Sequence, residues 1–246
     1  MLALRVTVPI ACFRKGFARE FWETEDLPPP STCYGFLLSM VGEYSRSRHL
    51  GVRVCPALLS RPQRSTVLRT LWRFKERRLG GSGNQRPDYQ ELLTGVDLAI
   101  WIDSSEETQE PPHLEARLIQ ALDDPRAVVR QSALCLGEST HMIDQVTRLD
   151  EARLPAGSAE AYLLSERGRL PLPVWVDHVG SSGTRYVMGN LETLDTFPPQ
   201  LDRQPIGFTL KPQRLDDLQI DLAIGGFRRM QILTLRQLPH GQGAGV

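Results

Sequence analysis

Residues 27–43, LPPPSTCYGFLLSMVGE, join three consecutive prolines to a short apolar segment. Proline fixes φ and removes the backbone donor, so the three prolines predict a stiff, extended approach to the apolar segment. Ser31 or Thr32 is predicted to cap a helix over residues 33–41, and Gly42 is predicted to end it. The free N–H groups at the start of such a helix form an anion site. The stretch is therefore a candidate phosphate contact as well as a structural element.

Strands and helices alternate on both sides of this helix. Apolar and polar residues alternate over residues 4–8, which predicts a strand ahead of it. After it, strands are predicted over residues 52–59, 96–102 and 128–136, and leucines at i, i+4 and i+8 predict a helix over residues 113–122. The order strand–helix–strand–strand–helix–strand predicts an α+β, ferredoxin-like fold, which is also the order of RNA-recognition domains.

The second part of the chain has a different pattern. Residues 171–191 predict a hairpin that turns at Ser181–Gly183, and short apolar segments follow near Phe208, Leu222 and Leu233. We therefore expect a ferredoxin-like domain at residues 1–145 and a smaller β-rich portion at residues 146–246.

Residues 61–86, RPQRSTVLRTLWRFKERRLGGSGNQR, interrupt the strand pattern with a local charge of +7. One acid, Glu76, stands among the basic residues Arg61, Arg64, Arg69, Arg73, Lys75, Arg77, Arg78 and Arg86. Three glycines near residue 82 predict a flexible tip. We interpret the insert, which extends to about residue 90, as a long hairpin or mobile arm.

Trp72 and Phe74 lie among the arginines of this insert. Cations neutralise phosphates, and aromatic rings and guanidinium planes stack on unpaired bases, so RNA or single-stranded DNA is the favoured ligand. A docking arm for an acidic protein and a solvated charged surface are the alternatives. Residues 13–15, FRK, are a weaker combination of aromatic and basic residues. A second RNA contact and a loop that closes over the core are equally good interpretations of them. Residues 224–232, IGGFRRMQI, are a third basic segment or a strand bulge.

The whole chain carries no net charge, so nucleic-acid binding would have to come from a local patch. All but three of the 29 basic residues are arginines, which suits phosphate recognition but is also what a GC-rich genome produces. The four cysteines are widely spaced, so we expect buried thiols, and no metal or cofactor. With no basic leader and no apolar run of membrane-spanning length, we expect a soluble, cytoplasmic protein without a membrane partner.

Four stretches together resemble the CRISPR-associated Cas-five family, which are RAMP-superfamily subunits of type I effector complexes. They are LRVTVPIACFRK, LPPPSTCYGFLLSMVGE, RPDYQELLTGVDLAIWID and SALCLGES, and the resemblance covers about residues 2–142. It implies a ferredoxin-like RAMP domain with a long hairpin thumb between its second and third strands, where residues 61–86 fall. It also points to a type I-B or transposon-associated system.

The resemblance implies a non-catalytic subunit of a Cascade complex, supporting RNA-guided DNA targeting. Such a subunit caps the 5′ handle of the guide crRNA, contacts the Cas-seven backbone subunit and the Cas-eight large subunit, and meets target DNA indirectly. The expected RNA-binding residues come from the first loop, the helix start and the insert: Arg14, Lys15, Ser31, Thr32, Arg64, Arg69, Trp72, Arg73, Lys75, Arg77, Arg78 and Arg86.

The alternative function is a metal-independent endoribonuclease that processes precursor crRNA. One subgroup of the family cuts that RNA with a tyrosine, a lysine and a histidine, but no such trio is placed by a motif here. The sequence holds no recognised nucleophile or metal motif, and LGEST, which adjoins His141, is expected to be a turn. We therefore expect no catalytic residue; a nuclease would need His141 or His49 as its general base.

Overall fold

The computed structural model describes residues 1–16, 18, 20–78, 80–164, 167–177, 183–197, 199 and 208–209. All of them lie in one compact unit, Met1–Pro212. The predicted apolar segments near Leu222 and Leu233, the basic segment 224–232 and most of the predicted turn near residue 181 lie outside the described residues.

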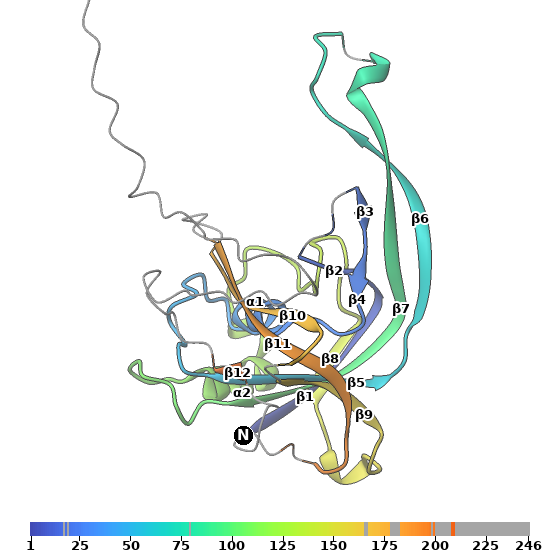
Figure 1. Ribbon diagram of the computed structural model, residues 1–246. Coiled ribbons are helices and arrows are strands. Elements are labelled where there is room, and N and C mark those ends of the chain that lie inside the picture. Colours follow the sequence, from blue (N-terminus) through green and yellow to red (C-terminus); the bar gives the residue numbers. More distant parts are fainter. Residues whose placement is uncertain are drawn as a thin grey trace, which may run out of the picture. The chain divides into compact units, whose positions relative to one another are not determined.

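Four neighbouring antiparallel strands make up one end of a ten-stranded sheet among the described residues (Figure 1). They are β1 (Leu2–Ala11), β5 (Arg53–Ser60), β7 (Gln85–Asp103) and β8 (Gln145–Arg148), in the spatial order β8–β1–β7–β5. Helix α1 (Pro30–Met40) connects β1 towards β5, and α2 (Leu114–Asp123) follows β7. The predicted strands at 4–8, 52–59 and 96–102 and the predicted helix at 113–122 are confirmed.

The two faces of this sheet are covered differently. Leucine, isoleucine and valine at alternate positions of β1 and β7 point to the face that α1 and α2 cover, as in Leu4, Val6 and Ile100, which are fully buried. On the other face Trp101 stacks on Phe197, with ring centroids 5.8 Å apart, among small alanines. The alternation over residues 4–8 therefore marks the face that the helices cover, while Arg5 remains exposed on the other face.

The predicted fourth strand at residues 128–136 is wrong, and β8 takes its place. After a 3₁₀ turn, Pro125–Ala127, the segment runs across the end of α1 instead of joining the sheet. Arg130 donates to the carbonyl of Met40 through Nε at 3.1 Å and Nη2 at 2.7 Å. Apolar residues there pack on the helix end, so their alternation was a poor guide to strand pairing.

Helix α1 begins earlier than its capping residues predict. Pro29 is its N-cap and Pro30 its first residue, so neither Ser31 nor Thr32 caps it. A proline suits that first position because the N–H it lacks would have no partner. The end is as predicted: Gly42 has φ of +67°, and Glu43 N–H donates to Leu38 O at 2.9 Å, which closes the helix.

The C-terminal strands extend the same sheet. The predicted hairpin is present as β10 (Leu170–Asp177) paired with β11 (Gly183–Leu194). β11 pairs with β9 (Ala159–Leu164), β9 pairs with β5, and β12 (Phe208–Thr209) also pairs with β5. A short 3₁₀ turn, Glu151–Arg153, precedes them. The division expected at residues 145 and 146 therefore does not coincide with a break in the sheet.

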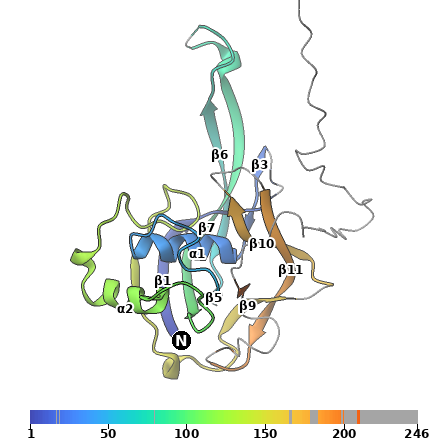
Figure 2. The same ribbon diagram turned by 90° about the vertical axis from the view of Figure 1, so that its left-hand side faces the viewer.

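The basic insert forms a long hairpin, as predicted. β6 (Gln63–Trp72) pairs with the first half of β7, from Gln63 opposite Thr94 to Trp72 opposite Gln85. Residues 63–94, called the arm below, project from the central sheet in both views (Figures 1 and 2). Because β7 continues from the arm into the sheet, one unbroken strand carries the arm.

The tip of the arm is organised by one side chain. Asn84, buried at the end of a 3₁₀ turn (Ser82–Asn84), accepts from the N–H groups of Lys75 and Glu76 at 2.8 Å each. Its amide donates to the carbonyls of Glu76 at 3.2 Å and Arg78 at 2.9 Å. These four hydrogen bonds join the two sides of the tip, and the flexibility expected from its glycines stays a prediction.

Asn84→Ala is expected to loosen the tip without weakening the fold. Four backbone groups lose their partner, at roughly 0.5–1.5 kcal/mol for each hydrogen bond. Amide hydrogen exchange of residues 75–78 should accelerate, while the melting temperature stays the same because the tip lies outside the core. Asn84→Asp keeps the acceptor and loses the donor, so its exchange rates should lie between those of the native protein and those of Asn84→Ala. Unchanged exchange in Asn84→Ala would contradict the role.

Three of the four cysteines, Cys12, Cys33 and Cys55, are buried as expected, and Cys135 is half-buried. Burial raises the pKa of the Cys33 and Cys55 thiols, which keeps them protonated. In the part of the chain that the structure describes, no helix combines the length and apolar character needed to cross a membrane.

Candidate nucleic-acid interface

The N-terminal loop folds onto the base of the arm. β2 (Phe13–Arg14) pairs with β4 (Thr24–Glu25), and β3 (Phe21–Trp22) runs parallel to β7, with Trp22 opposite Gln90. The hydroxyl of Thr24 accepts from Phe13 N–H at 2.8 Å, which holds the loop in place. The two basic, aromatic segments of the sequence therefore form one surface.

Trp22 is the centre of that surface. The guanidinium carbons of Arg14 and Arg69 lie 4.4 Å and 4.2 Å from its ring centroid. Arg14 donates to the carbonyl of Ala18 at 2.7 Å, and Arg69 is held by Gln90 and by Glu138, the latter at 3.6 Å. Cation–π contacts of this kind fix both planar cations on the indole.

A cavity of about 570 Å³, called the N-terminal groove, opens beside this surface. It lies where the N-terminal loop, the start of α1, residues 137–140 and strands β10 and β11 meet. Its lining is Cys12, Phe13, Arg14, Gly16, Trp22, Pro29, Ser31, Thr32, Gly137, Glu138, Ser139, Thr140, Pro173, Val176 and Tyr186. Cationic, aromatic and hydroxyl groups thus line one hollow.

The helix start in this groove offers fewer donors than the sequence suggests. Pro30 has no N–H, and the N–H groups of Thr32 and Cys33 both donate to Pro29 O, at 2.9 Å and 3.1 Å. Ser31 is left with a free N–H and a hydroxyl that has no hydrogen-bond partner among the described residues, although the residue is only 5% exposed. Of the backbone donors expected at the helix start, that of Ser31 is therefore the one left uncommitted among the described residues.

Two arginines on the paired strands of the arm and one lysine of the N-terminal loop are already paired. Arg64 contacts Asp26 and Glu91, the latter at 2.7 Å, and Arg86 contacts Asp88 at 2.8 Å and Glu20 at 3.3 Å. Lys15 lies 3.4 Å from Glu23. The local charge of +7 counted along the sequence is thus reduced by acids from the N-terminal loop and from β7.

The cations at the tip remain available. Arg73, Lys75, Arg77 and Arg78 are exposed, and within the described part of the chain their side chains make no hydrogen bond or ion pair. Trp72 and Phe74 beside them are 63% and 83% exposed. The unneutralised charge of the arm therefore lies at its tip, next to two open aromatic faces.

The predicted site residues fall into three groups. Arg14, Ser31 and Thr32 line the N-terminal groove. Arg64, Arg69 and Arg86 lie on the paired strands of the arm, with Lys15 in the N-terminal loop, and the remaining five lie at the outer end of the arm: Trp72, Arg73, Lys75, Arg77 and Arg78. Sequence reasoning missed Trp22, although its neighbours marked it, and missed Tyr186, which reaches the groove from a strand distant in sequence.

The two histidines considered as general bases both have ring nitrogens engaged in hydrogen bonds. His49 is fully buried, with Nδ1 2.7 Å from Glu107 and Nε2 2.9 Å from Arg117, so it has no access to a substrate. His141 accepts from Cys12 N–H at Nδ1 at 3.1 Å, and burial lowers its pKa. Among the described residues, no three His, Cys, Asp or Glu side chains form a group that could hold a metal.

The chain is similar to known CRISPR proteins. It is 49% identical over 207 residues to CRISPR-associated protein Cas5 of Myxococcus xanthus (strain DK1622), covering 83% of this chain and 96% of that protein. A solved CRISPR RNA-guided surveillance complex contains a chain that matches with a TM-score of 0.53 at 16% identity, covering 79% of this chain and 90% of that one. A solved Cas protein matches with a TM-score of 0.46 at 15% identity, covering 79% and 94%. No protein-family model matches.

Proposed function

Since the chain belongs to the CRISPR-associated protein Cas5 family, we propose that it is a non-catalytic RNA-binding subunit of a type I CRISPR effector complex. In this role it caps the 5′ handle of the guide crRNA. The observation that carries the proposal is the N-terminal groove, in which Arg14, Trp22 and Ser31 meet beside the arm. Stacking surfaces and phosphate contacts of this kind suit single-stranded RNA.

The fold we infer is a ferredoxin-like RAMP domain. The spatial order β8–β1–β7–β5, antiparallel throughout, with one helix after β1 and one after β7, supports it. The arm takes the position of the thumb, between the second and third strands of that domain. The solved surveillance complex supports the general fold.

The arm also supports a role in assembly. Leu68 and Tyr89, which are opposite each other on its two strands, are 63% and 55% exposed, and Trp72 lies further along β6. Exposed apolar side chains in a row suit contact with a neighbouring protein. We propose that the Cas-seven backbone subunit and the Cas-eight large subunit bind around the arm, and that target DNA is met indirectly through the guide.

The deciding experiment is a nuclease footprint of the guide in the purified effector complex. The handle should be protected with this chain present and open to a single-strand nuclease when the chain is omitted. The alternative, processing of precursor crRNA, is tested by incubating the protein with labelled repeat RNA in EDTA. We expect no cleavage; a product formed under those conditions would replace the proposal by the endoribonuclease function.

Trp22→Ala is expected to weaken retention of the guide. Each cation–π contact contributes roughly 0.5–2 kcal/mol, so loss of the indole releases the guanidinium groups of Arg14 and Arg69 and should give about a 2- to 30-fold faster exchange of the guide against a competitor RNA. Trp22→Phe keeps a ring between the two arginines and should stay close to the native rate. Equal rates for Trp22→Ala and the native complex would remove Trp22 from the binding surface.

A further inference from the structure

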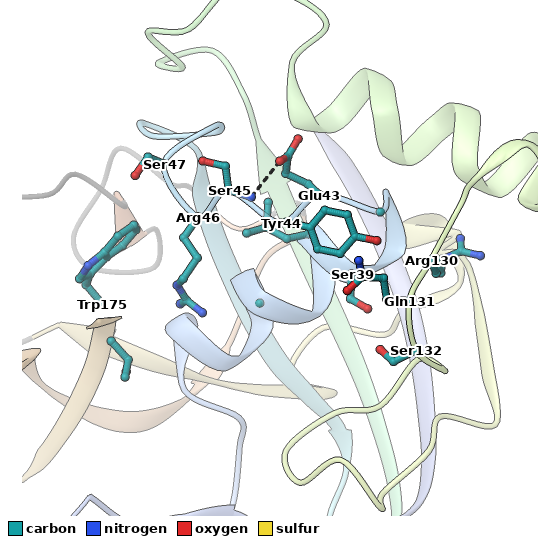
Figure 3. A pocket seen from close by; sticks show the side chains of 14 residues that line it. Ser39, Glu43, Tyr44, Ser45, Arg46, Ser47, Arg130, Gln131, Ser132 and Trp175 are labelled. Atoms are coloured by element: carbon teal, nitrogen blue, oxygen red, sulfur yellow. Dashed lines mark hydrogen bonds between the residues drawn. The ribbon is translucent and has the colours of Figure 1, made fainter. Parts of the chain in front are cut away.

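A second cavity, of about 920 Å³, lies towards the C-terminal end of α1. Its lining comes from α1, the loop at residues 42–47, residues 130–132 and strand β10 (Figure 3). Arg46 and Trp175 lie at one end of it, and Arg130, Gln131 and Ser132 at the other. None of the residues expected to bind RNA lines this C-terminal cavity.

The charge of the C-terminal cavity favours an anion. Its lining contains two cations, Arg46 and Arg130, and one acid, Glu43. The carboxylate of Glu43 is already engaged, because it accepts from Arg117 at 2.7 Å and from Ser45 N–H at 2.9 Å. The lining therefore carries more positive than negative charge, and a positive hollow attracts anionic ligands.

Arg46 is oriented before any ligand binds. Its guanidinium carbon lies 5.5 Å from the ring centroid of Trp175 and 6.0 Å from that of Tyr34. The hydroxyl of Tyr34 donates to Arg46 O at 2.7 Å, which fixes the backbone as well. A cation held beside an indole is the pairing that binds a phosphate and an adjacent base together.

The remaining polar groups of the cavity are uncommitted. The hydroxyls of Ser39, Ser45, Ser47 and Ser132 make no side-chain hydrogen bond among the described residues. Arg130 uses Nε and Nη2 on the carbonyl of Met40, which leaves the donors of its other terminal nitrogen available. Hydroxyl and guanidinium donors of this kind suit phosphodiester oxygens.

The C-terminal cavity and the N-terminal groove lie along one path. Val176 lines both. Thr32 lines the groove, and Gly35 and Ser39 line the cavity, at i, i+3 and i+7, so the three share one side of α1. At about 1.5 Å per residue, Thr32 and Ser39 are roughly 10 Å apart along α1, so a short extended strand is long enough to reach both hollows.

We propose that the C-terminal cavity is a second binding site for single-stranded RNA, which receives the strand after it passes the N-terminal groove along α1. The inference rests on the proposed function, since it requires that the groove binds the guide. It goes beyond that function because it assigns Arg46, Arg130 and Trp175 to RNA binding, and no stretch of sequence marks them for it. An acidic segment of a partner protein is the competing occupant.

Gly35 provides the test, because a side chain added there enters the cavity. Its Cβ would lie 3.8 Å from Nη1 of Arg46, an ordinary contact, and replacing a helical glycine stabilises the helix. Gly35→Glu places a carboxylate beside Arg46, and Gly35→Gln is the matched control of equal size without the charge. Both variants should fold, which circular dichroism and thermal melting of the full chain check.

The experiment uses the assembled effector complex with guides that carry 4-thiouridine at successive handle positions. We expect light-induced crosslinks to the peptides of residues 44–47 and 175 as well as to the groove. Gly35→Glu should reduce the cavity crosslinks about tenfold or more and spare those to the groove, while Gly35→Gln retains a larger part of them. A normal groove pattern without cavity crosslinks, or a protein segment crosslinked there instead, would overturn the inference alone. Absence of crosslinks at both places would overturn the proposed function as well.

Discussion

Replacing Arg73, Lys75, Arg77 and Arg78 by alanine is expected to lower the affinity of the effector complex for its guide by roughly 10²- to 10³-fold at 0.1 M salt. These four side chains are exposed at the tip of the arm and make no hydrogen bond or ion pair in the described part of the chain. Each phosphate contact to a single strand contributes about 0.7 to the slope of log affinity against log salt. The slope should therefore fall by roughly 3 units, and the affinity difference should vanish near 1 M salt.

Two controls separate the charge of the tip from its structure. Changing the three arginines to lysine keeps the charge and should retain the slope. Alanine at Arg126 and Arg153, which are exposed elsewhere in the fold, removes charge away from the arm and should leave guide binding unchanged. If the quadruple alanine variant binds the guide with the native slope of log affinity against log salt, the tip does not contact phosphates. The N-terminal groove then provides the binding.

Glu107→Gln is expected to cause the largest loss of stability, about 1–3 kcal/mol in the free energy of unfolding. The carboxylate of Glu107 is 1% exposed, contacts His49 at 2.7 Å and accepts from Leu114 N–H at 2.9 Å. Arg117 contacts the other ring nitrogen of His49 and Glu43. The substitution leaves buried polar groups without their partner, which urea denaturation at pH 7 would measure.

The pH dependence of this effect follows from the pKa of Glu107. Burial by itself would raise that pKa, but hydrogen bonds from His49, Ser104 and Leu114 lower it below the ordinary value of 4.5. The unfolded chain therefore takes up the proton first as the pH falls, so the stabilisation is complete above about pH 4.5 and is lost below it. The gap between native and Glu107→Gln stability should narrow in that range.

Glu106→Gln is the matched control, since Glu106 is the exposed neighbour of Glu107 and is 3.7 Å from Arg53. Its loss should cost less than about 1 kcal/mol. A similarly small cost at Glu107 would show that the buried network does not stabilise this part of the fold.

Much of the fold could be predicted from local patterns. The alternation in β1 and the leucine stripe of α2 identified their elements, because periodicity reports which face of an element is buried. The basic insert identified the arm, since a run of cations with alternating apolar residues has few other places to lie. Residues 128–136 were predicted wrongly because they pack on the end of α1, a contact that no local pattern encodes.

The candidate site was predictable only in part. Arg14, Ser31 and Thr32 were identified from neighbouring residues, and the structure places all three in one groove. Arg64 and Arg86 were expected to be available, but they are paired with acids. Two of those acids, Glu20 and Asp26, lie in the N-terminal loop, and Glu138 near Arg69 comes from a third segment.

The sequence by itself determined that an arm exists, that it is basic and that a proline-led helix ends at Gly42, because charge and backbone restrictions act within a few residues. Tertiary structure alone decided which cations remain unpaired, since that depends on acids brought in from distant segments. It also changed the meaning of residues 27–43. Pro30 lacks an N–H and the next donors are taken up by Pro29 O, so α1 contributes Ser31 and one side, from Thr32 to Ser39, rather than an open N-terminus.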